Sequence, residues 1–219
     1  MSETNQISKQ ALQRMPYYLQ QLKQLEREGA HIATARTVAG MLRLNEVQVR
    51  KDFAAVSPGK GRPKTGFPIA DLISGMELLL GYNRQKNAIL VGAGSLGRAL
   101  LSYGTFLDYG LNIAAAFDND PALAGHQING KPVYPMEALE EVAHHLEARI
   151  GIITCPAASA QYVCDRLVDC GVLAIWNFAP AHLKAPENIL IQSENMAASL
   201  AVLTMHLSER LTDADKASG

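Results

Sequence analysis

Cysteine is scarce in this chain of 219 residues, and its three cysteines form no motif. Cys155, Cys164 and Cys170 include no CxxC pair and are odd in number. Such a set is typical neither of a disulfide framework nor of a zinc site. We therefore predict three buried or half-buried thiols and no metal site.

The chain also lacks a long apolar run, since no stretch of about 18 apolar residues occurs in it. It begins with the polar segment "MSETNQISKQ", where a signal peptide has an apolar stretch. Hydrophobic residues nevertheless make up 48% of the chain, which is ample for packed cores. We expect neither membrane insertion nor export, and we expect the protein to act in the cytoplasm.

The net charge of −1 conceals an uneven distribution of charge along the chain. Residues 1–85 contain 12 Lys and Arg against 7 Asp and Glu, whereas residues 86–219 contain 8 against 14. The basic first part predicts a domain that faces a polyanion, and the acidic second part predicts a domain with another partner. The alternative is that both are ordinary solvated surfaces.

The first part has helical patterns on both sides of an irregular segment. Residues 6–28 carry apolar side chains mostly three or four apart, which predicts one amphipathic helix or a helix pair broken near Pro16. Residues 57–68 are rich in glycine and proline, which predicts a loop or wing. Residues 69–83 return to a helical pattern, and residues 84–87 are the expected linker.

Residues 34–56, "TARTVAGMLRLNEVQVRKDFAAV", fit two short helices joined by a tight turn. Thr34 can cap the first helix and Asn45 can cap the second. Helices joined so closely cross at a steep angle, as in a helix-turn-helix. Val49 and Phe53 are four residues apart, so both are expected to face inward.

The second of these helices and the loop after it carry residue types that suit DNA recognition. We expect Gln48, Arg50, Lys51 and Asp52 on the other faces of the helix. Gln48 suits adenine, whereas Arg50 and Lys51 suit guanine edges or phosphates. Arg62 on the basic loop suits a narrow A/T-rich minor groove, although a solvated basic face is the alternative throughout. The predicted DNA-binding residues are Thr34, Arg36, Asn45, Gln48, Arg50, Lys51, Lys60, Arg62 and Lys64.

From Ala88 onward, short apolar strands alternate with helical stretches. This alternation predicts an α/β domain with a parallel sheet that is covered on both faces. The expected strands span residues 88–92, 112–117, 149–154, 172–177 and 188–192. The expected helices span residues 96–103, 136–146, 158–170 and 195–211.

"NAILVGAGSLGRAL", residues 87–100, has the pattern of a strand, a glycine-rich turn and a helix. Gly92 permits the tight turn, Gly94 lets the backbone approach a pyrophosphate, and Gly97 allows the helix to pack closely on the strand. Asp118 ends the next strand, where a carboxylate accepts hydrogen bonds from a ribose and repels a 2′-phosphate. The motif predicts a Rossmann domain that prefers NAD(H) to NADP(H). The alternatives are a purely structural turn and, at Asp118, a plain surface acid.

Two further stretches follow later strands, namely "TCPAASAQ" at residues 154–161 and "NFAP" at residues 177–180. The carboxyl ends of the strands line the ligand crevice of an open α/β sheet, so these stretches are expected to flank the cofactor. Turn formation at Pro156 and Pro180 is the alternative. The predicted cofactor residues are Gly92, Ala93, Gly94, Ser95, Leu96, Gly97, Asp118, Asn119, Pro156, Ala157, Asn177 and Phe178.

The last helical segment carries a continuous apolar stripe of Met196, Leu200, Leu203, Leu207 and Leu211. The stripe predicts a homodimer, and packing on its own domain is the alternative. A dimeric helix-turn-helix presents two recognition helices about one DNA turn apart. We therefore expect a palindromic operator, and the basic loop predicts that it is A/T-rich.

An NAD-dependent oxidoreductase is the rival function. Residues 86–219 suffice for a Rossmann unit and one tail helix but leave no room for a separate substrate domain. His182 lies near a predicted strand end, whereas His144 and His145 are adjacent on a helix and point apart. We predict no catalytic residues and no enzymatic activity, and we take NAD(H) to be a regulatory ligand.

Over about residues 6–211 the chain resembles the Rex family of bacterial redox-sensing transcriptional repressors, and six motifs carry the resemblance. They are "RMPYYLQQL", "VQVRKDF", "VGAGSLGRAL", "FDNDPALAG", "CPAASAQ" and "NFAP". The resemblance implies a winged-helix domain on double-stranded DNA at residues 1–85 and a Rossmann NAD(H) domain at residues 86–192. It also implies a C-terminal helix, within residues 193–219, that is exchanged between the subunits of a homodimer. In such a repressor NADH rearranges the dimer and releases the operator, whereas NAD⁺ is compatible with DNA binding.

Three features depart from the family's usual pattern. Ser95 stands where Asn is usual, residues 57–67 replace a glycine-aromatic wing, and Asn195 takes the place of an Asp. In the family that Asp pairs with an Arg and a Tyr in different redox states, and the matching positions here are Arg14 and Tyr103. A neutral amide forfeits the ionic part of the pairing with Arg14. A regulator with altered redox sensitivity, or one that responds to another nucleotide, therefore stays an alternative.

The resemblance adds three residues to the expected site. The switch residues are Arg14, Tyr103 and Asn195, and Tyr103, Asn195 and Met196 join the cofactor set. An apolar pocket disfavours the positive charge of oxidised nicotinamide. If Met196 enters that pocket from the other subunit, NADH stabilises a closed dimer in which the recognition helices no longer match successive major grooves.

Overall fold

The structure is a computed structural model that describes residues 7–57 and 65–217. The chain divides into two compact units, residues 1–84 and 85–219, and each is described by itself. Across the described segments, no helix is long and apolar enough to cross a lipid bilayer.

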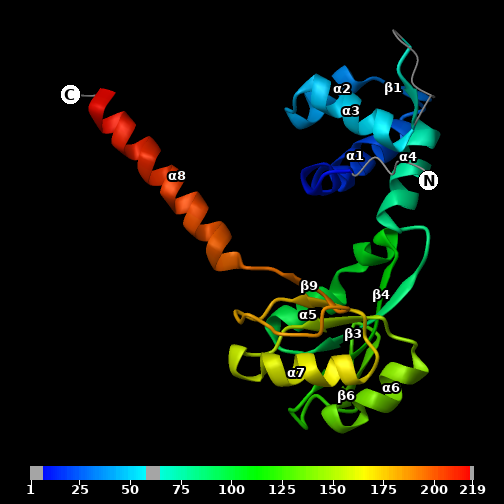
Figure 1. The fold of residues 1–219 in the computed structure, drawn as a ribbon, viewed down its shortest axis with the longest axis vertical. Helices are drawn as coiled ribbons and strands as arrows, with labels where there is room; N and C mark the ends of the chain where they lie inside the picture. Colours follow the sequence, from blue (N-terminus) through cyan, green and yellow to red (C-terminus); the bar gives the residue numbers. More distant parts are fainter. Residues whose placement is uncertain (1–6, 58–64, 218–219) are drawn as a thin grey trace. The chain divides into compact units, whose positions relative to one another are not determined.

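The first unit is mainly helical (Figure 1). α1 packs against α4 and α2 against α3, and β1 pairs antiparallel with β2 so that Ala33 lies opposite Phe67. Its elements are α1 (Lys9–Arg27), β1 (Ile32–Ala33), α2 (Ala35–Leu42), α3 (Glu46–Val56), β2 (Phe67–Pro68) and α4 (Ile69–Leu80).

α1 runs without a break through Pro16, so residues 9–27 form one helix and not a pair. A proline inside a helix removes one backbone hydrogen bond and costs about 3 kcal/mol. Met15, Tyr18 and Leu22 flank the proline and are fully buried, at 0% exposure. Burial of such side chains contributes about 1.5–3 kcal/mol each, which outweighs the cost of the proline.

The predicted helix-turn-helix is confirmed. The Thr34 hydroxyl accepts a hydrogen bond from the Thr37 amide at 3.0 Å, and Asn45 Oδ1 accepts one from the Val47 amide at 2.9 Å. Arg43 ends α2 in the left-handed region with φ of 54°, which turns the chain sharply toward α3. Both caps therefore begin the helices at the residues expected from the sequence.

α3 and α4 approach each other very closely at one glycine. A Cβ atom placed on Gly75 of α4 would lie 2.2 Å from the carbonyl oxygen of Val56, the last residue of α3. Real Cβ atoms do not come that close to a carbonyl oxygen. The crossing of these two helices therefore requires glycine at position 75.

The second unit is built on a seven-stranded sheet with the strand order β5-β6-β4-β3-β7-β8-β9. All neighbours pair in parallel except β5 and β6. The strands are β3 (Lys86–Val91), β4 (Leu111–Asp118), β5 (Gln127–Ile128), β6 (Lys131–Pro135), β7 (Ile150–Ile153), β8 (Ala174–Asn177) and β9 (Leu190–Ser193).

Five of these strands match the expected ones, whereas the hairpin of β5 and β6 was not predicted. The turn between them consists of Asn129 and Gly130, both with positive φ, which is a two-residue hairpin turn typical of Asn-Gly. That dipeptide was the available signal. The expected linker at residues 84–87 was also partly wrong, because β3 already begins at Lys86.

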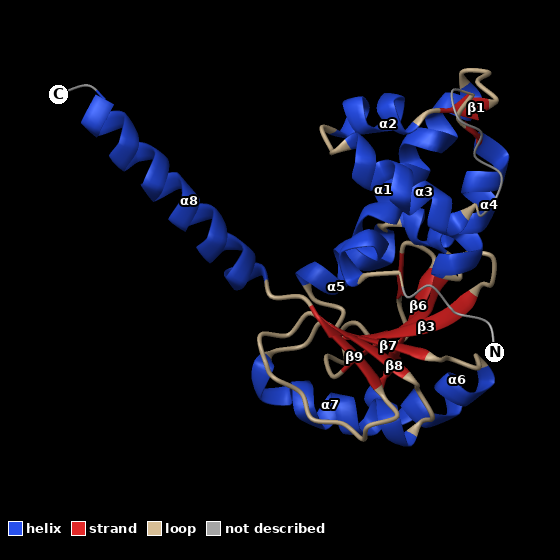
Figure 2. Ribbon diagram, turned by 45° about the horizontal axis from the view of Figure 1, so that its top comes forward, coloured by secondary structure: helices blue, strands red, loops and turns tan. Residues whose placement is uncertain are grey.

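Helices cover both faces of the sheet, as predicted (Figure 2). Ile89 and Val91 of β3 join a core cluster with residues of α6 and α7, whereas Ala88 and Leu90 join a second cluster with Leu101 of α5. The helical elements are α5 (Ser95–Ser102), η1 (Gly104–Tyr109), η2 (Met136–Ala138), α6 (Leu139–His145), α7 (Ala157–Asp169) and α8 (Met196–Ala217).

The apolar stripe of α8 is not covered by any part of the chain that the structure describes. Every described side chain from Met196 to Leu211 is exposed, and Met196 and Leu203 are exposed by 65% and 64%. Packing of this stripe on its own domain was the alternative to a dimer, and such packing is absent among residues 7–57 and 65–217.

Candidate functional site

The glycine-rich turn connects β3 to α5 through close backbone contacts. Gly92 has a φ of +103°, and a Cβ atom on it would lie 2.8 Å from the backbone nitrogen of Cys155. A Cβ atom on Gly97 would lie 2.0 Å from the carbonyl oxygen of Gly92. These two positions admit no side chain, which is what a tight turn packed against its helix requires.

Gly94 differs from both, because a Cβ atom placed on it would meet nothing within 4 Å. Its neighbour Ser95 begins α5, whose first-turn N–H groups lack partners within the helix. The positive end of the helix dipole lies at the same place. An anionic group can therefore approach the backbone at Gly94 and bind to these N–H groups.

A cavity of about 790 Å³ lies beside this turn, at the carboxyl ends of β3, β4 and β7. Thr154 lines the cavity, and its hydroxyl donates to the carbonyl oxygens of Val91 and Gly92, at 3.1 and 2.6 Å. The volume is in the usual range for small-molecule and cofactor sites. Of the predicted cofactor residues, those that line the cavity are Gly92, Gly94, Leu96, Asp118, Asn119, Pro156 and Phe178.

Asp118 is the charged residue of this cavity, and its carboxylate has two backbone partners. Oδ2 accepts a hydrogen bond from the Ala93 amide at 2.6 Å, and Oδ1 accepts one from the Asp120 amide at 2.9 Å. A carboxylate has about four acceptor positions, so roughly two stay available to a ligand. Asp118 thus both fixes the glycine-rich turn and presents an acceptor to the cavity.

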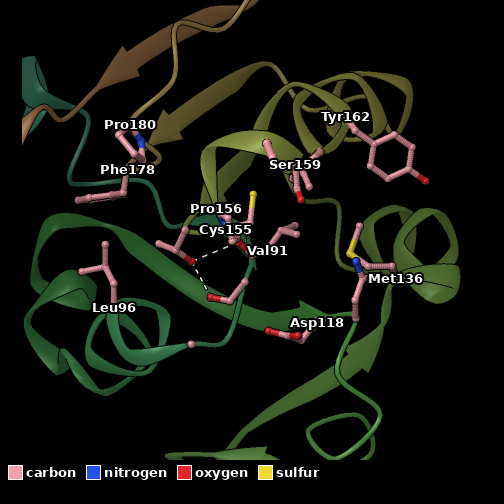
Figure 3. A pocket seen from close by; sticks show the side chains of 16 residues that line it. Val91, Leu96, Asp118, Met136, Cys155, Pro156, Ser159, Tyr162, Phe178 and Pro180 are labelled. Atoms are coloured by element: carbon pink, nitrogen blue, oxygen red, sulfur yellow. Dashed lines mark hydrogen bonds between the residues drawn. The ribbon is translucent and has the colours of Figure 1, made fainter.

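The two ends of the cavity differ in character (Figure 3). Leu96 and Phe178 lie at one end, while Met136 and Tyr162 lie at the other, with Asp118 toward Met136. The first end is lined by apolar side chains. A ligand that extends across the glycine-rich turn would therefore have one end in apolar surroundings and a hydroxyl-bearing group near Asp118.

Asn177, predicted for the cofactor, is fully buried beneath the cavity. Its amide group donates to the carbonyl oxygen of Ala181 at 3.0 Å and to Ser193 Oγ at 3.3 Å. Its oxygen accepts from the Ala179 amide at 2.9 Å. Asn177 therefore holds the turn that carries Phe178. Ala93, Ser95, Gly97 and Ala157 lie in the same turns without being among the cavity-lining residues.

The three residues added by the family resemblance lie elsewhere in the described chain. Tyr103 is exposed by 51% and packs edge-on against Phe106, at 4.8 Å between ring centroids. Asn195 caps α8, because its Oδ1 accepts a hydrogen bond from the Ala198 amide at 3.0 Å. Met196 follows it on the exposed first turn of α8.

Met136 and Tyr162 line the cavity without having been predicted, whereas Thr154 and Cys155 belong to the stretch 154–161 that was expected to flank the cofactor. Met136 directly follows β6, so the strand-end rule would have found it, whereas Tyr162 lies inside α7 and carried no such signal. Burial raises the pKa of the Cys155 thiol, which keeps it protonated. All three cysteines are free and buried or half-buried, as expected.

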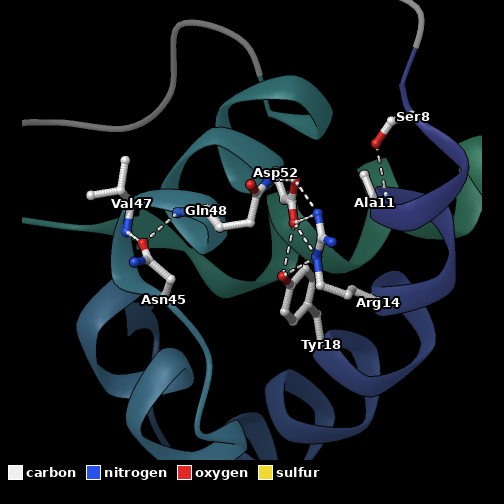
Figure 4. Close-up of polar contacts among 8 residues, drawn as sticks. All are labelled: Ser8, Ala11, Arg14, Tyr18, Asn45, Val47, Gln48 and Asp52. Atoms are coloured by element: carbon white, nitrogen blue, oxygen red, sulfur yellow. Dashed lines mark hydrogen bonds and ion pairs between the residues drawn. The ribbon is translucent and has the colours of Figure 1, made fainter.

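The first unit contains a buried polar cluster around Asp52 of α3 (Figure 4). Asp52 is only 4% exposed, so the expectation that it lies on an outer face was wrong. Arg14 Nε donates to its Oδ2 at 2.9 Å, Tyr18 Oη donates to Oδ2 at 2.8 Å, and Gln48 Nε2 donates to Oδ1 at 2.9 Å. Burial, together with the hydrogen bond to Asp52, raises the pKa of Tyr18 to about 12.

The charge of Arg14 explains why Asp52 is buried. Arg14 Nη2 lies 2.8 Å from Oδ2 and 3.1 Å from Oδ1, so the guanidinium binds both carboxylate oxygens. A buried carboxylate is stable only when it is paired and hydrogen-bonded in this way. The partners lie 38 residues apart in sequence, which is why helical periodicity did not reveal the cluster.

The remaining predicted DNA-binding residues lie on exposed positions of α2 and α3 or at their starts. Arg36 and Arg50 both pair with Glu46, while Lys51 is exposed. A shallow cavity of about 550 Å³ is lined by residues that include Asn45 and Gln48. Lys60, Arg62 and Lys64 fall outside the residues that the structure describes.

Each half of the chain matches a known family description. Residues 6–54 match "Putative DNA-binding protein N-terminus", and residues 83–181 match "CoA binding domain". These two segments fall in the helical unit and in the sheet unit, respectively.

Curated relatives match nearly the whole chain. A redox-sensing transcriptional repressor Rex of Treponema denticola is 35% identical over 91% of this chain and 95% of its own. A protein of the same name from Carboxydothermus hydrogenoformans is 36% identical over 92% of this chain and 96% of its own.

Solved structures agree with these relatives. RSP in complex with β-NAD⁺ and operator DNA has a TM-score of 0.86 at 30% identity and covers 95% of this chain and 96% of its own. RSP in complex with β-NADH has a TM-score of 0.81 at 28% identity, over 96% of this chain and 99% of its own. RSP is described as a Rex-family repressor.

Proposed function

This chain belongs to the Rex family of redox-sensing transcriptional repressors, and from that premise we infer that it represses transcription under the control of NADH and NAD⁺. The observation that carries the proposal is the pairing, in one chain, of a capped helix-turn-helix with the Gly94 turn facing Asp118. We assign DNA binding to residues 1–85, NAD(H) binding to residues 86–192 and dimer exchange to residues 193–219.

The second unit fits NAD(H) as its regulatory ligand. The pyrophosphate would lie over Gly94 at the start of α5, where no Cβ atom interferes. Asp118 would accept hydrogen bonds from the ribose of the adenosine half, and its charge would repel a 2′-phosphate. The nicotinamide would then reach the apolar end near Leu96 and Phe178.

The apolar end gives a physical reason for redox sensing. Oxidised nicotinamide carries a positive charge that the reduced ring lacks, and apolar surroundings disfavour the charged form. Binding of NADH would favour one arrangement of a homodimer and binding of NAD⁺ another. A coupling of about 1–3 kcal/mol between the nucleotide and DNA sites is typical of such regulation.

The uncovered stripe on α8 supports the homodimer. A helix with side chains such as Met196 and Leu203 exposed by about two thirds needs a partner surface. Exchange of this helix would bring Met196 to the nicotinamide end of the other subunit's cavity. The two recognition helices would then bind a palindromic, A/T-rich operator in successive major grooves.

The redox switch is proposed to involve Arg14, Tyr103 and Asn195. In the single chain Arg14 pairs with Asp52, and Asn195 caps α8. The switch would require each side chain to exchange this contact for a new one or to make both. An amide at position 195 gives Arg14 a hydrogen-bond acceptor without a charge. We therefore propose a weaker switch than a carboxylate at this position would give.

We propose that the protein is a regulator without enzymatic activity and that it acts in the cytoplasm, where DNA and NAD(H) occur together. Its relatives are named as transcriptional repressors. Incubation with NADH and candidate carbonyl substrates, followed at 340 nm, should give no turnover. Steady consumption of NADH would favour the rival oxidoreductase.

The decisive experiment is a titration of operator-bound protein with each nucleotide. An operator is first selected from a random duplex library and labelled for fluorescence anisotropy. NADH is expected to release the DNA at lower concentration than NAD⁺. Equal effects of the two nucleotides would exclude redox sensing, and no effect of either would exclude the nucleotide link.

Trp176 supplies an independent readout of nucleotide binding, because it is the single tryptophan of the chain. Its ring lies 4.8 Å from that of Phe178, which lines the cavity. Bound NADH should therefore quench Trp176 emission by energy transfer. A Trp176→Phe variant provides the control, since it should bind NADH without this signal.

A further inference from the structure

The side-chain amide of Gln48 is held in one orientation by a buried carboxylate. Gln48 is exposed on α3, and its Nε2 donates to Asp52 Oδ1 at 2.9 Å (Figure 4). Asp52 lies one helical turn further along α3, four residues away. An exposed glutamine is ordinarily free to rotate, whereas this one is tied to the domain core.

Asp52 acts here only as an acceptor. Arg14 binds both of its oxygens, and Tyr18 donates a further hydrogen bond to Oδ2. Arg14 and Tyr18 thus occupy both oxygens as donors, and the carboxylate offers Gln48 an acceptor position on Oδ1. The partner that Gln48 presents to Asp52 must therefore be its N–H group.

The reversed amide would be strongly disfavoured. Rotation by 180° would bring Gln48 Oε1 to the position of Nε2, 2.9 Å from Asp52 Oδ1, so that two acceptors would face each other. The amide therefore keeps one N–H on Asp52. With the N–H anti to Oε1 on Asp52, the other N–H and Oε1 lie together on the opposite edge, as a donor next to an acceptor.

That edge matches one base. In the major groove adenine offers the N7 acceptor beside the N6 donor, which is the complement of an amide edge. Guanine offers two acceptors there, and cytosine offers a single donor. The oriented amide thus selects adenine without the loss of side-chain freedom that a mobile glutamine would incur on binding.

We propose that Asp52 is a positioning residue for base recognition, which fixes the Gln48 amide so that α3 reads an adenine. The inference rests on the proposed DNA-binding function and deepens it. Arg14 takes part by binding both oxygens of Asp52, so a residue of α1 supports base reading by α3. Lys51, which is exposed beside Asp52, has no part in the arrangement.

The test uses the full-length protein and the selected operator. At each adenine of the operator the duplex is synthesised with 7-deazaadenine, which lacks N7, or with purine, which lacks the N6 amino group. Wild type should show one position per half-site where each analogue weakens binding by about tenfold. Gln48→Ala should remove the discrimination at that position only.

Asp52→Asn tests the positioning role directly. An amide at position 52 can turn a donor toward Gln48, so the discrimination between adenine and its analogues should fall from about tenfold to below threefold. The ratio of affinities is measured, so a uniform loss of affinity from weakened folding does not affect the result. Tyr18→Phe is the matched control, because it removes a donor to Asp52 and leaves the Gln48 contact in place.

Tyr18→Phe should lower thermal stability and leave the discrimination unchanged, and Lys51→Ala should weaken binding to all duplexes equally. Should Asp52→Asn not fold, the side-chain amide signals of Gln48 in wild type decide by NMR. One Nε2 proton shifted downfield and protected from exchange supports the proposal, and two signals at solvent-exposed positions overturn it.

The two inferences fail in distinguishable ways. Recovery of no preferred sequence by wild type would overturn the proposed function itself. A selected operator whose adenines are insensitive to Gln48→Ala, or a discrimination that survives Asp52→Asn, would overturn the positioning role alone.

Discussion

Each unit of this protein has one carboxylate at the centre of its polar contacts, and the two differ in what surrounds them. Asp52 in the helical unit is 4% exposed, and its oxygens are bound by Arg14, Tyr18 and Gln48. Asp118 in the sheet unit faces a cavity and accepts hydrogen bonds from two backbone amides. One carboxylate is satisfied by its own domain, and the other keeps acceptor positions available.

The difference separates a positioning site from a ligand site. A buried carboxylate with a paired arginine holds neighbouring side chains in place, and loss of either partner leaves an uncompensated group. A half-buried carboxylate with open acceptor positions gains its last partners from a ligand. Substitutions at Asp52 and its partners should therefore change folding and geometry, whereas substitution of Asp118 itself should mainly change the affinity for the nucleotide.

The largest effects are expected at the glycine-rich turn of the sheet unit. Gly97→Ala would place a Cβ atom 2.0 Å from the carbonyl oxygen of Gly92, so the helix and the turn must separate. We expect a loss of at least about 3 kcal/mol in the free energy of unfolding, measured by urea denaturation. Gly94→Ala is the matched control, since its Cβ atom meets nothing within 4 Å.

Gly94→Ala should fold as wild type does and lose NADH affinity by at least about tenfold, because the methyl group projects where the pyrophosphate approaches. Isothermal titration measures the affinity. Equal stability of the two variants would contradict the packing at Gly97, and unchanged affinity in Gly94→Ala would contradict the anion site.

In the helical unit, Arg14→Met removes the guanidinium and leaves Asp52 buried without its counter-charge. The free energy of unfolding should fall by about 3 kcal/mol, as for other broken buried ion pairs. Arg36→Met is the control, because the Arg36 side chain is 84% exposed and its pairing with Glu46 is solvated. Equal free energies of unfolding for the two variants would show that the Arg14–Asp52 pair is not buried.

Asp118→Ala tests the open carboxylate of the sheet unit. The variant should bind NADH about tenfold or more weakly and should discriminate less against NADPH, because the repulsion of the 2′-phosphate is lost. Quenching of Trp176 reports both affinities. Asp108→Ala makes the same change in charge at an exposed residue and should leave them as they are. A variant at position 118 that keeps its preference for NADH would remove Asp118 from the site.

The satisfied carboxylate also has a consequence at high pH, through Tyr18. An unfolded chain loses the phenol proton near pH 10, whereas the folded chain keeps it to about pH 12. The free energy of unfolding should therefore fall between pH 10 and pH 12, by up to about 3 kcal/mol from this group. Tyr18→Phe lacks the step, so the difference between the two curves should shrink over that range. A constant difference would contradict the raised pKa.

The smallest effect is expected where the two units are proposed to communicate. Asn195→Asp keeps the helix cap, because aspartate caps helices as well as asparagine does. It adds a charge that can pair with Arg14, so the NADH concentration that releases half of the operator should fall by less than tenfold. An unchanged NADH dose-response curve would refute a switch role for this position.

Much of the fold was predictable because it depends on local signals. Thr34 and Asn45 mark their helices by capping, and the five apolar strands of the sheet are continuous in sequence. The hairpin of β5 and β6 was missed although Asn129 and Gly130 carry its turn signal, since β5 has only two residues and β6 contains two prolines. Local patterns thus located the helices and the longer strands better than they located the short strands at the edge of the sheet.

The site was predictable only in part, for the same reason. The glycines and Asp118 act through backbone geometry that their spacing reveals. Asp52 acts through Arg14 and Tyr18, which come from another helix and join it only when the domain folds. The pattern of an amphipathic helix does not reveal that a charged residue has a partner on another helix, so Asp52 was expected to be exposed to solvent.

Gly75 allows the position of the recognition helix to be compared between related chains. A methyl group at position 75 would clash with the backbone of Val56, so the packing of α3 against α4 depends on glycine at this position. Related chains that have glycine at the position equivalent to 75 should hold their recognition helix in the same position relative to the domain core. A larger residue there would mark chains whose helix is displaced, and whose operators should differ from this one even where the base-contacting side chains are identical.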